Sequence, residues 1–183
     1  MEIIKTFIPD LFVIKPNIFK DNRGFFFEIY NNKRYSDEIF GYDFIQDNLS
    51  QSKKGTIRGL HYQLNPYSQA KLVTVIQGAV LDVVVDLRKS SPTFGNSFSI
   101  ELSEDNNLQV YVPRGFAHGF EVLCPETLFY YKCDNIYNKE SERGINIFDP
   151  NLAINWRIPK KKAVISEKDM VLPFFSDAEI NFD

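Results

Sequence analysis

The sequence of 183 residues is poor in histidine and cysteine, and it carries no excess of positive charge. Its 21 Lys and Arg residues are outnumbered by 24 Asp and Glu residues, which gives a net charge of -3. Proteins that bind nucleic acid usually show a basic excess or a basic stripe, so no nucleic-acid partner is expected. The densest basic run, Lys160-Lys161-Lys162, is interpreted as a solvated loop rather than a phosphate-binding patch.

The cysteines and the apolar runs exclude further classes of protein. Cys124 and Cys133 lack the C-x-x-C spacing of a zinc site, and two thiols are too few for a disulfide scaffold. No apolar run approaches the ~20 residues of a membrane span. The first ten residues include Glu2, Lys5 and Asp10, so they lack the apolar core of a signal peptide. We therefore expect a cytoplasmic protein that has no membrane partner.

Alternation of apolar and polar residues dominates the rest of the sequence. Hydrophobic residues form 44% of the chain and aromatic residues 15%, which is typical of a globular protein rich in strands. The alternation predicts strands with one buried face at residues 25–30, 81–87, 97–102 and 108–112. Many short strands separated by turn sequences favour an all-β sandwich or barrel of antiparallel strands.

Helix signals are few. Asn32 to Phe40 are predicted to form a short helix that Gly41 ends, and Ser166-Glu167-Lys168-Asp169 resembles a capping box that opens another. No linker, repeat or low-complexity tract is present, so residues 1–183 are expected to form one domain. The sequence contains neither G-x-G-x-x-G nor G-x-x-x-x-G-K-[ST], which disfavours a Rossmann or P-loop nucleotide site.

Imidazole chemistry is limited to His61 and His118, and both lie in unusual sequence surroundings. An isolated histidine is more often a hydrogen-bonded structural residue, but His61 follows a cation and a glycine within a strand-like run. Arg58 and His61 have opposite parity, so a regular strand would send them to opposite faces. A bulge at Gly59 would direct both side chains to the same side.

A histidine that acts as a base near neutral pH needs a partner, because its ordinary pKa is about 6.5. A carboxylate on the far ring nitrogen would fix the tautomer and stabilise the imidazolium. Asp169 is a candidate for this partner. Its position three residues after Ser166 is also typical of a helix cap, which is the more frequent role, and the two roles are compatible.

Other polar candidates carry weaker signals. Lys71 opens a strand-like run, where a lysine is usually solvated, and Tyr131 lies in an aromatic run, where a tyrosine is usually half-buried core. A cupin-type metal site would have a second histidine at position 63, where this sequence has Gln63. Two histidines with no obvious carboxylate partner make a poor metal site, so no metal is expected.

Nine motifs follow one another in order from Phe19 to Asp169, and the resemblance that they carry extends from about Phe12 to Asp177. They are Phe19-x-Asp21-x-Arg23-Gly24-x-Phe26-x-Glu28, Gln46-x-Asn48-x-Ser50-x-Ser52, Arg58-Gly59-Leu60-His61-Tyr62-Gln63, Lys71-Leu72-Val73, Asp82-Val83-x-Val85-Asp86-Leu87-Arg88-x-x-Ser91-Pro92-Thr93-x-Gly95, Pro113-x-Gly115-Phe116-Ala117-His118-Gly119-Phe120, Tyr131-Lys132, Tyr137 and Ser166-x-Lys168-Asp169. Together they resemble the dTDP-4-dehydrorhamnose 3,5-epimerase family, deoxysugar-nucleotide epimerases of the cupin superfamily. Arg157 stands where many relatives have proline, outside the residues that the resemblance assigns to the site.

This resemblance implies a cupin-type jelly-roll barrel with a few short helices, a homodimer, and an isomerase that needs no cofactor. Its implied reaction converts dTDP-4-dehydro-6-deoxy-D-glucose into dTDP-4-dehydro-L-rhamnose, in dTDP-L-rhamnose biosynthesis. His61 is the implied base, oriented by Asp169, with Tyr131 as the acid on the opposite face and Lys71 beside the C4 oxygen. The implied substrate-binding residues are Arg23, Phe26, Glu28, Gln46, Asn48, Arg58, His118, Tyr137, Glu142 and Lys168.

Two alternatives remain open from the sequence. Relatives that epimerise only C3 or only C5 of a similar dTDP-4-keto-6-deoxysugar can keep the same histidine and tyrosine. A non-catalytic cupin that binds sugar nucleotides is the other alternative. It is disfavoured because binding alone requires neither a base such as His61 nor an opposed acid such as Tyr131.

Overall fold

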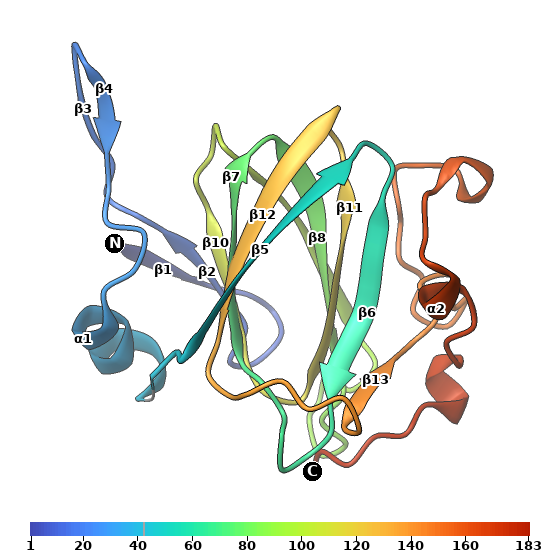
Figure 1. Cartoon of the computed structure of the whole chain (residues 1–183). Coiled ribbons are helices and arrows are strands. Elements are labelled where there is room, and N and C mark those ends of the chain that lie inside the picture. Colours follow the sequence, from blue (N-terminus) through green and yellow to red (C-terminus); the bar gives the residue numbers. More distant parts are fainter. Residues whose placement is uncertain (42) are drawn as a thin grey trace.

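The computed structural model describes residues 1–41 and 43–183, and its main feature is a pair of antiparallel sheets (Figure 1). Within these residues, the strands of the first sheet run in the order β1 (Glu2–Lys5), β2 (Phe12–Lys15), β10 (Gln109–Val112), β7 (Lys71–Gln77), β12 (Glu126–Cys133) and β5 (Gln46–Lys53). Those of the second run in the order β13 (Glu142–Gly144), β6 (Ile57–Gln63), β11 (Phe116–Val122), β8 (Ala79–Asp86) and β9 (Ser97–Ser103). The expected all-β barrel of antiparallel strands is confirmed.

The core inside the barrel is built from alternate residues of facing strands. Val80 and Val84 of β8 pack there with Val73 of β7 and Phe129 of β12. Because successive side chains of a strand point to opposite faces, the intervening residues of β8 point outward. The inner face therefore holds an apolar core, into which the polar site residues described below are set.

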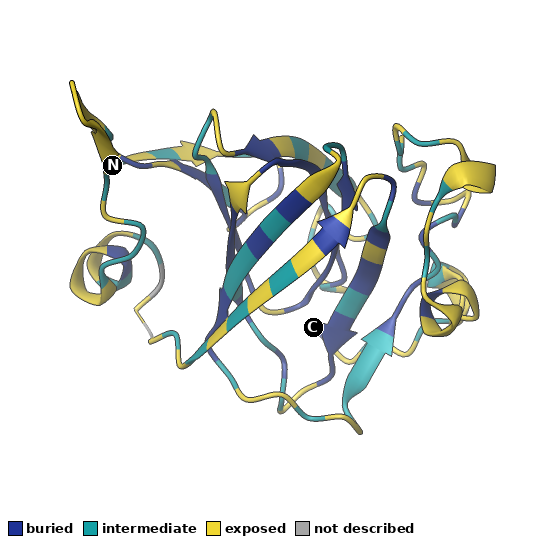
Figure 2. Cartoon of the chain, turned by 45° about the horizontal axis from the view of Figure 1, so that its top comes forward, coloured by how far each residue is buried: buried dark blue, intermediate teal, exposed yellow. Residues whose placement is uncertain are grey.

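The outer face of the second sheet is also buried, which the alternation did not predict. Leu81, Val83 and Val85 pack against residues that follow β13, such as Ile147 and Leu152. Both faces of β8 are consequently buried, and so are both faces of β10. The prediction of a single buried face is therefore wrong at residues 81–87 and at residues 108–112. In Figure 2 the strand that lies beside this C-terminal segment is drawn largely in dark blue. Long-range covering of this kind leaves no trace in the local pattern.

Short helical segments lie outside the barrel. They are α1 (Asn32–Tyr35), the π-helical turn η1 (Ser36–Phe40), the 3₁₀ turns η2 (Lys160–Lys162) and η3 (Phe175–Asp177), and α2 (Glu167–Met170). The predicted helix over Asn32–Phe40 is confirmed, and Gly41 ends it in the left-handed region at φ 51°. The predicted second helix is α2, and no helix in the described ranges is long and apolar enough to cross a membrane.

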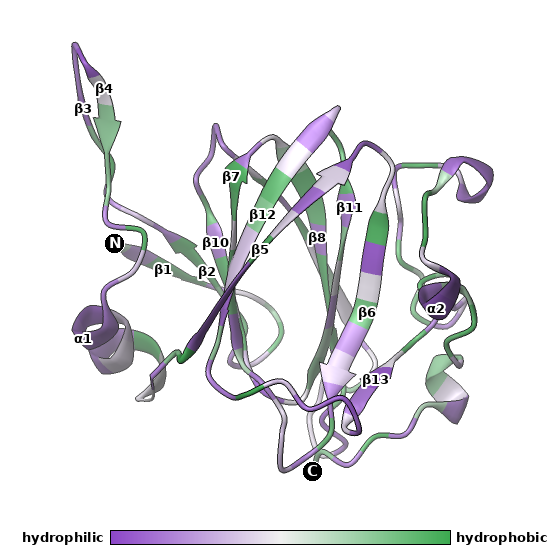
Figure 3. Cartoon of the chain, in the orientation of Figure 1, coloured by the Kyte–Doolittle hydropathy of each residue, from purple (hydrophilic) through white to green (hydrophobic). Residues whose placement is uncertain are grey.

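A small hairpin projects away from both sheets. It consists of β3 (Phe19–Asp21) and β4 (Gly24–Phe26), drawn in blue at the top left of Figure 1. Figure 3 shows the hydrophobic colour of β4, although this part of the chain is exposed. The strand predicted over 25–30 is therefore much shorter than expected, since β4 ends at Phe26. The hairpin joins neither of the two large sheets, so β4 pairs with β3 alone.

Candidate active site

A bulge in β6 brings two site residues to one side of the sheet. Phe120 of β11 pairs with Arg58 and His118 pairs with His61, so β6 has one extra residue in this interval. Gly59 lies at φ +136°, and a Cβ there would come within 2.6 Å of the Gly119 Cα atom. Glycine is required by both the dihedral and the close approach. The predicted bulge is confirmed, and the side chains of Arg58 and His61 line one cavity.

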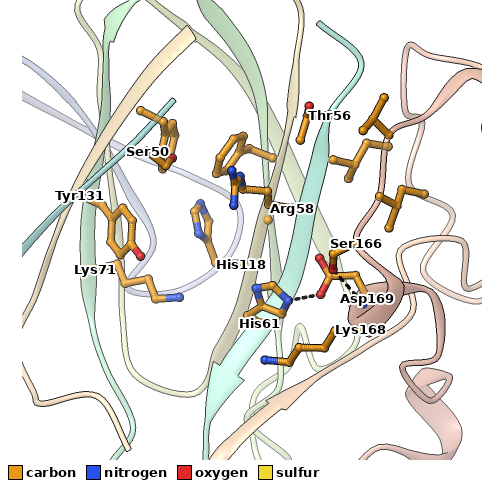
Figure 4. Close-up of a pocket in the computed structure, with 16 residues that line it drawn as sticks. Ser50, Thr56, Arg58, His61, Lys71, His118, Tyr131, Ser166, Lys168 and Asp169 are labelled. Atoms are coloured by element: carbon orange, nitrogen blue, oxygen red, sulfur yellow. Dashed lines mark hydrogen bonds and ion pairs between the residues drawn. The ribbon is translucent and has the colours of Figure 1, made fainter. Parts of the chain in front are cut away.

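That cavity has a volume of about 460 Å³ and lies between the two sheets. All four candidate catalytic residues and three of the candidate binding residues line it (Figure 4); they are His61, Lys71, Tyr131 and Asp169, with Arg58, His118 and Lys168. A smaller adjoining cavity shares three of these residues and adds four candidate binding residues, Gln46, Asn48, Tyr137 and Glu142. The structure thus gathers most of the predicted site from strands of both sheets.

His61 and Asp169 form a hydrogen-bonded pair on one wall of the main cavity. The His61 Nε2 atom lies 2.7 Å from Oδ1 of Asp169, whose side chain is 5% exposed. Burial alone would raise the pKa of Asp169, but the hydrogen bond and charge of His61, together with the Gly59 backbone and Ser166, hold this pKa below its ordinary value. An ionised carboxylate only accepts hydrogen bonds, so Nε2 carries the hydrogen and Nδ1 remains as the basic nitrogen.

The capping role of the same segment is also present. The backbone N–H of Asp169 donates to Oγ of Ser166 at 3.1 Å, which caps α2 at its first turn. The short helix therefore presents the carboxylate at a fixed distance from β6. Both roles foreseen for Asp169 coexist, because the cap uses its backbone and the histidine uses its side chain.

Tyr131 and Lys71 lie on the opposite wall. They come from adjacent strands, β12 and β7, and Figure 4 shows them across the cavity from His61 and Asp169. Burial raises the pKa of the Tyr131 phenol, so the phenol keeps its proton at neutral pH. Burial lowers the pKa of Lys71, although nearby negative groups oppose this effect. The Lys71 ammonium has no hydrogen bond or ion pair with the described residues.

Arg58 and His118 complete the main cavity. The Arg58 Nε atom donates to Oγ of Ser52 at 3.0 Å, which holds the guanidinium at the end of β6. Nε2 of His118 lies 2.8 Å from Oδ2 of Asp82. Folding thus brings a carboxylate distant in sequence to each ring, Asp169 as the sequence suggested and Asp82 as it did not. Within the described residues, no three His, Cys, Asp or Glu side chains gather as a metal site.

The smaller cavity has a polar rim centred on Glu142. Its Oε2 atom accepts from Nζ of Lys168 at 2.6 Å and from the hydroxyl of Tyr137 at 2.9 Å. Burial opposes ionisation of Glu142, but these two contacts keep its pKa below the ordinary value. On the facing strand, Nε2 of Gln46 donates to Oδ1 of Asn48 at 3.0 Å. The rim therefore offers both signs of charge, amides and an exposed aromatic ring.

Three candidate binding residues lie outside these cavities. Arg23 and Phe26 are on the β3–β4 hairpin, where Arg23 pairs with Asp21 at 2.7 Å. Glu28 follows the hairpin and pairs with Arg34 at 2.8 Å. A single copy of the chain does not bring them to His61, since the hairpin projects away from the barrel (Figure 1).

Several residues of the site carry no strong sequence signal. The cavity is also lined by Ser50, Thr56, Ile57, Gly119, Phe120, Phe129, Val164, Ile165 and Ser166. Ser50, Gly119, Phe120 and Ser166 belong to motifs quoted from the sequence, although none was named there as a site residue. The remaining types are ordinary for strands, so only the fold selects them. Asp82 did carry a signal, an acidic residue inside the apolar run Val80 to Val85, but the alternation assigned it to an outer face.

Comparisons with known proteins decide the family. A sequence profile described as dTDP-4-dehydrorhamnose 3,5-epimerase matches residues 5–177. The chain belongs to this family. The dTDP-4-dehydrorhamnose 3,5-epimerase of Shigella flexneri is 48% identical over 180 residues, which cover 98% of each chain.

Solved structures of the epimerase family agree with the fold. The dTDP-4-dehydrorhamnose 3,5-epimerase of Elizabethkingia anophelis superposes with a TM-score of 0.92 at 49% identity, covering 97% of each chain. The 3,5-epimerase of Legionella pneumophila, solved in complex with dTDP-4-keto-L-rhamnose, gives 0.94 at 43% identity, covering 100% of this chain and 98% of that one. The expected cupin-type jelly roll of this epimerase family is thus confirmed.

Proposed function

We propose that this chain epimerises dTDP-4-dehydro-6-deoxy-D-glucose at C3 and C5 to dTDP-4-dehydro-L-rhamnose, in dTDP-L-rhamnose biosynthesis. The observation that carries this proposal is the His61–Asp169 pair on one cavity wall with Tyr131 on the other (Figure 4). Inversion of a carbon centre by proton transfer needs a base on one face and an acid on the opposite face. The cavity supplies both.

The base acts first. A C–H bond beside a ketone is acidic because the carbanion delocalises as an enolate, so Nδ1 of His61 takes the proton from the carbon next to C4. Asp169 stabilises the resulting imidazolium, with which it already shares a 2.7 Å hydrogen bond. A positioned base of this kind contributes roughly 10²- to 10⁴-fold in rate.

The opposite wall completes the step. Electrons from the broken C–H bond move to the C4 oxygen, where the Lys71 ammonium stabilises the charge in a cavity of low water content. Tyr131 then gives its phenolic proton to the other face of the same carbon. The His61 imidazolium releases the proton it took to solvent, and the Tyr131 phenolate takes one from solvent, which restores both residues. The raised pKa of Tyr131, caused by burial, suits an acid that must be protonated when substrate binds.

Binding of the nucleotide falls to the remaining polar residues. Arg58, His118 and Lys168 line the main cavity, and the cationic side chains of Arg58 and Lys168 suit a diphosphate. Gln46, Asn48 and Glu142 would contact the sugar nucleotide from the smaller cavity. Tyr137, which is 54% exposed at the rim, offers its ring to the base or the sugar.

We propose that the working form is a homodimer, in which the hairpin of one copy reaches the cavity of the other. Arg23 and Phe26 lie away from their own cavity, and the hairpin exposes Phe19, Phe25 and Phe26 by 60 to 70%. Exposed aromatic side chains on a projecting element mark an interaction site. A second copy would bury them and would bring Arg23 and Glu28 to a site.

Both cysteines are free, which supports a reducing, cytoplasmic setting.

Proton NMR in deuterated water tests the reaction. The protein is mixed with dTDP-4-dehydro-6-deoxy-D-glucose, and a reductase captures the product. Deuterium at both C3 and C5 with the rhamno configuration is the expected result. Exchange at one carbon only would establish a single epimerase. Binding of the sugar nucleotide without exchange at either carbon would establish a binding module.

A further inference from the structure

A second buried pair of histidine and carboxylate stands beside the first, and the proposed reaction leaves its carboxylate without a role. Asp82 lies on β8 with no exposed surface. Its neighbours on the same face of the strand, Val80 and Val84, belong to the apolar core inside the barrel. Burial of a carboxylate among apolar neighbours is costly, so its position in the core indicates a functional demand.

Asp82 has one strong contact and one oxygen without a partner. Its Oδ2 atom lies 2.8 Å from Nε2 of His118. Its Oδ1 atom is buried and has no hydrogen-bond partner among the described residues. A buried carboxylate requires a nearby positive charge or further hydrogen bonds. Lys71 lines the same cavity as His118, the hydrogen-bond partner of Asp82, and the charge of Asp82 opposes the lowering of the Lys71 pKa by burial.

The titratable groups that face Lys71 come from five other strands. They are His61 on β6, Asp82 on β8, His118 on β11, Tyr131 and Cys133 on β12, and Glu142 on β13. Burial raises the pKa of Cys133 to about 11, so this thiol is neutral at neutral pH. Glu142 is already paired with Lys168 at 2.6 Å. Of the two carboxylates in this set, Glu142 forms a salt bridge with a lysine, whereas Asp82 contacts only a histidine.

The contact with Asp82 also determines which nitrogen of His118 is available. A carboxylate only accepts hydrogen bonds, so Nε2 of His118 must carry a hydrogen. The ring is held from its face as well, stacked against Phe129 with centroids 6.0 Å apart and planes at 24°. Since His118 lines the cavity, Nδ1 is left for a ligand.

We propose that Asp82 is a positioning residue of the reaction, which orients His118 toward the sugar nucleotide and keeps Lys71 in its ammonium form as the enolate develops. This role rests on the proposed function, and Asp82 acts through His118 and Lys71 without touching substrate. A negative charge acts on a nearby cation far more strongly in a buried, low-dielectric site than in water. The same carboxylate can therefore serve both neighbours.

The variant Asp82→Asn tests the role, with Asp86→Asn as its matched control. Asp86 is on the same strand and equally buried, but it binds Arg88, Ser91 and Thr93 at the end of the barrel. D82N should lower kcat roughly 10- to 100-fold, the size expected for one charge-assisted hydrogen bond. It should also move the alkaline limb of the kcat/KM profile to lower pH, because Lys71 then loses its proton more easily.

D86N should lower the melting temperature without moving that alkaline limb. If D82N keeps the wild-type kcat and the wild-type alkaline limb of the kcat/KM profile, the positioning role is overturned and Asp82 is a structural residue. Failure of the proposed function is a separate outcome, since it would appear as wild-type protein that exchanges no proton of dTDP-4-dehydro-6-deoxy-D-glucose.

A second measurement tests the contact between Asp82 and His118 in protein with Asp82 intact, so it does not depend on whether an Asp82 variant folds. The chain has two histidines, so ¹⁵N NMR of the imidazoles, with His61→Asn as the assignment variant, resolves the His118 ring. We expect Nε2 of His118 to be protonated throughout the pH range in which the protein is folded. A bare Nε2 with hydrogen on Nδ1 would contradict the contact and therefore the proposal.

Discussion

The imidazole of His61 and the carboxylate of Asp169 are 108 positions apart in the sequence and 2.7 Å apart in the structure. One comes from a bulged strand of the barrel and the other from the first turn of a four-residue helix that lies outside it. The Ser166 cap fixes the backbone at the helix end, and the short Asp169 side chain therefore holds its carboxylate at a fixed place. This pairing gives the proposed reaction its base.

Asp169→Asn should keep the shape of the pair and remove its charge. We expect kcat to fall roughly 10²- to 10⁴-fold, because the imidazolium loses its stabilising carboxylate and the amide permits the wrong tautomer. Steady-state kinetics of the coupled reaction, with dTDP binding by calorimetry as the control, measure the effect. Retention of wild-type kcat in D169N would remove Asp169 from the catalytic set.

The same residue makes a prediction for stability against pH. Burial raises the pKa of Asp169 in the folded state, but the His61 contacts, the Gly59 backbone and Ser166 together outweigh burial and lower it. Its contribution to the free energy of unfolding is therefore present above the pKa of an unfolded aspartate, about 3.9, and is lost as pH falls through the folded value. Urea unfolding of wild type and D169N should show a stability gap at pH 7 that narrows in acid. A gap that widens in acid would contradict the lowered pKa.

Tyr131→Phe should separate proton removal from inversion. His61 is intact in this variant, so substrate protons next to C4 should still exchange with solvent deuterium. Reprotonation then lacks its acid on the far wall, and inversion should fall roughly 10²- to 10⁴-fold. NMR of recovered substrate should show deuterium with retained configuration. Full inversion by Y131F would mean that another group supplies the proton.

Gly59→Ala should damage both the fold and the site. A side chain at φ +136° is strained, and its Cβ would lie 2.6 Å from Gly119 Cα. We expect a loss of about 3 kcal/mol or more in unfolding free energy. Gly24→Ala is the matched control, since Gly24 has φ +135° with nothing within 4 Å, and it should cost only about 1–2 kcal/mol. Equal losses in thermal unfolding of the two variants would show that the contact with Gly119 is unimportant.

The proposed exchange of hairpins in a homodimer predicts complementation. Arg23→Ala and His61→Asn should each be inactive or weakly active alone. After unfolding and refolding as a mixture, heterodimers would pair an intact cavity with an intact hairpin, and activity should return to roughly a quarter of wild type by random assortment. Light scattering checks the dimer. No recovery in a mixture shown to contain heterodimers would place Arg23 in its own chain's function.

Much of this protein is determined by its local sequence. Alternation predicts the strands at 97–102 and 108–112, which are β9 and β10, and Gly41 and Ser166 mark helix ends where the structure has them. The parity mismatch of Arg58 and His61 indicates the bulge at Gly59. These features are local, because side-chain direction and backbone dihedrals depend on residues within a few positions.

Tertiary structure alone decided the rest. The sequence pattern placed Asp82 on an outer face, and only the closure of the two sheets around it and its contact with the His118 ring make it a buried, functional candidate. The pattern likewise could not tell that Arg23 projects away from the cavity of its own chain. Contacts between distant segments depend on sheet order and strand register, and local periodicity does not encode either one.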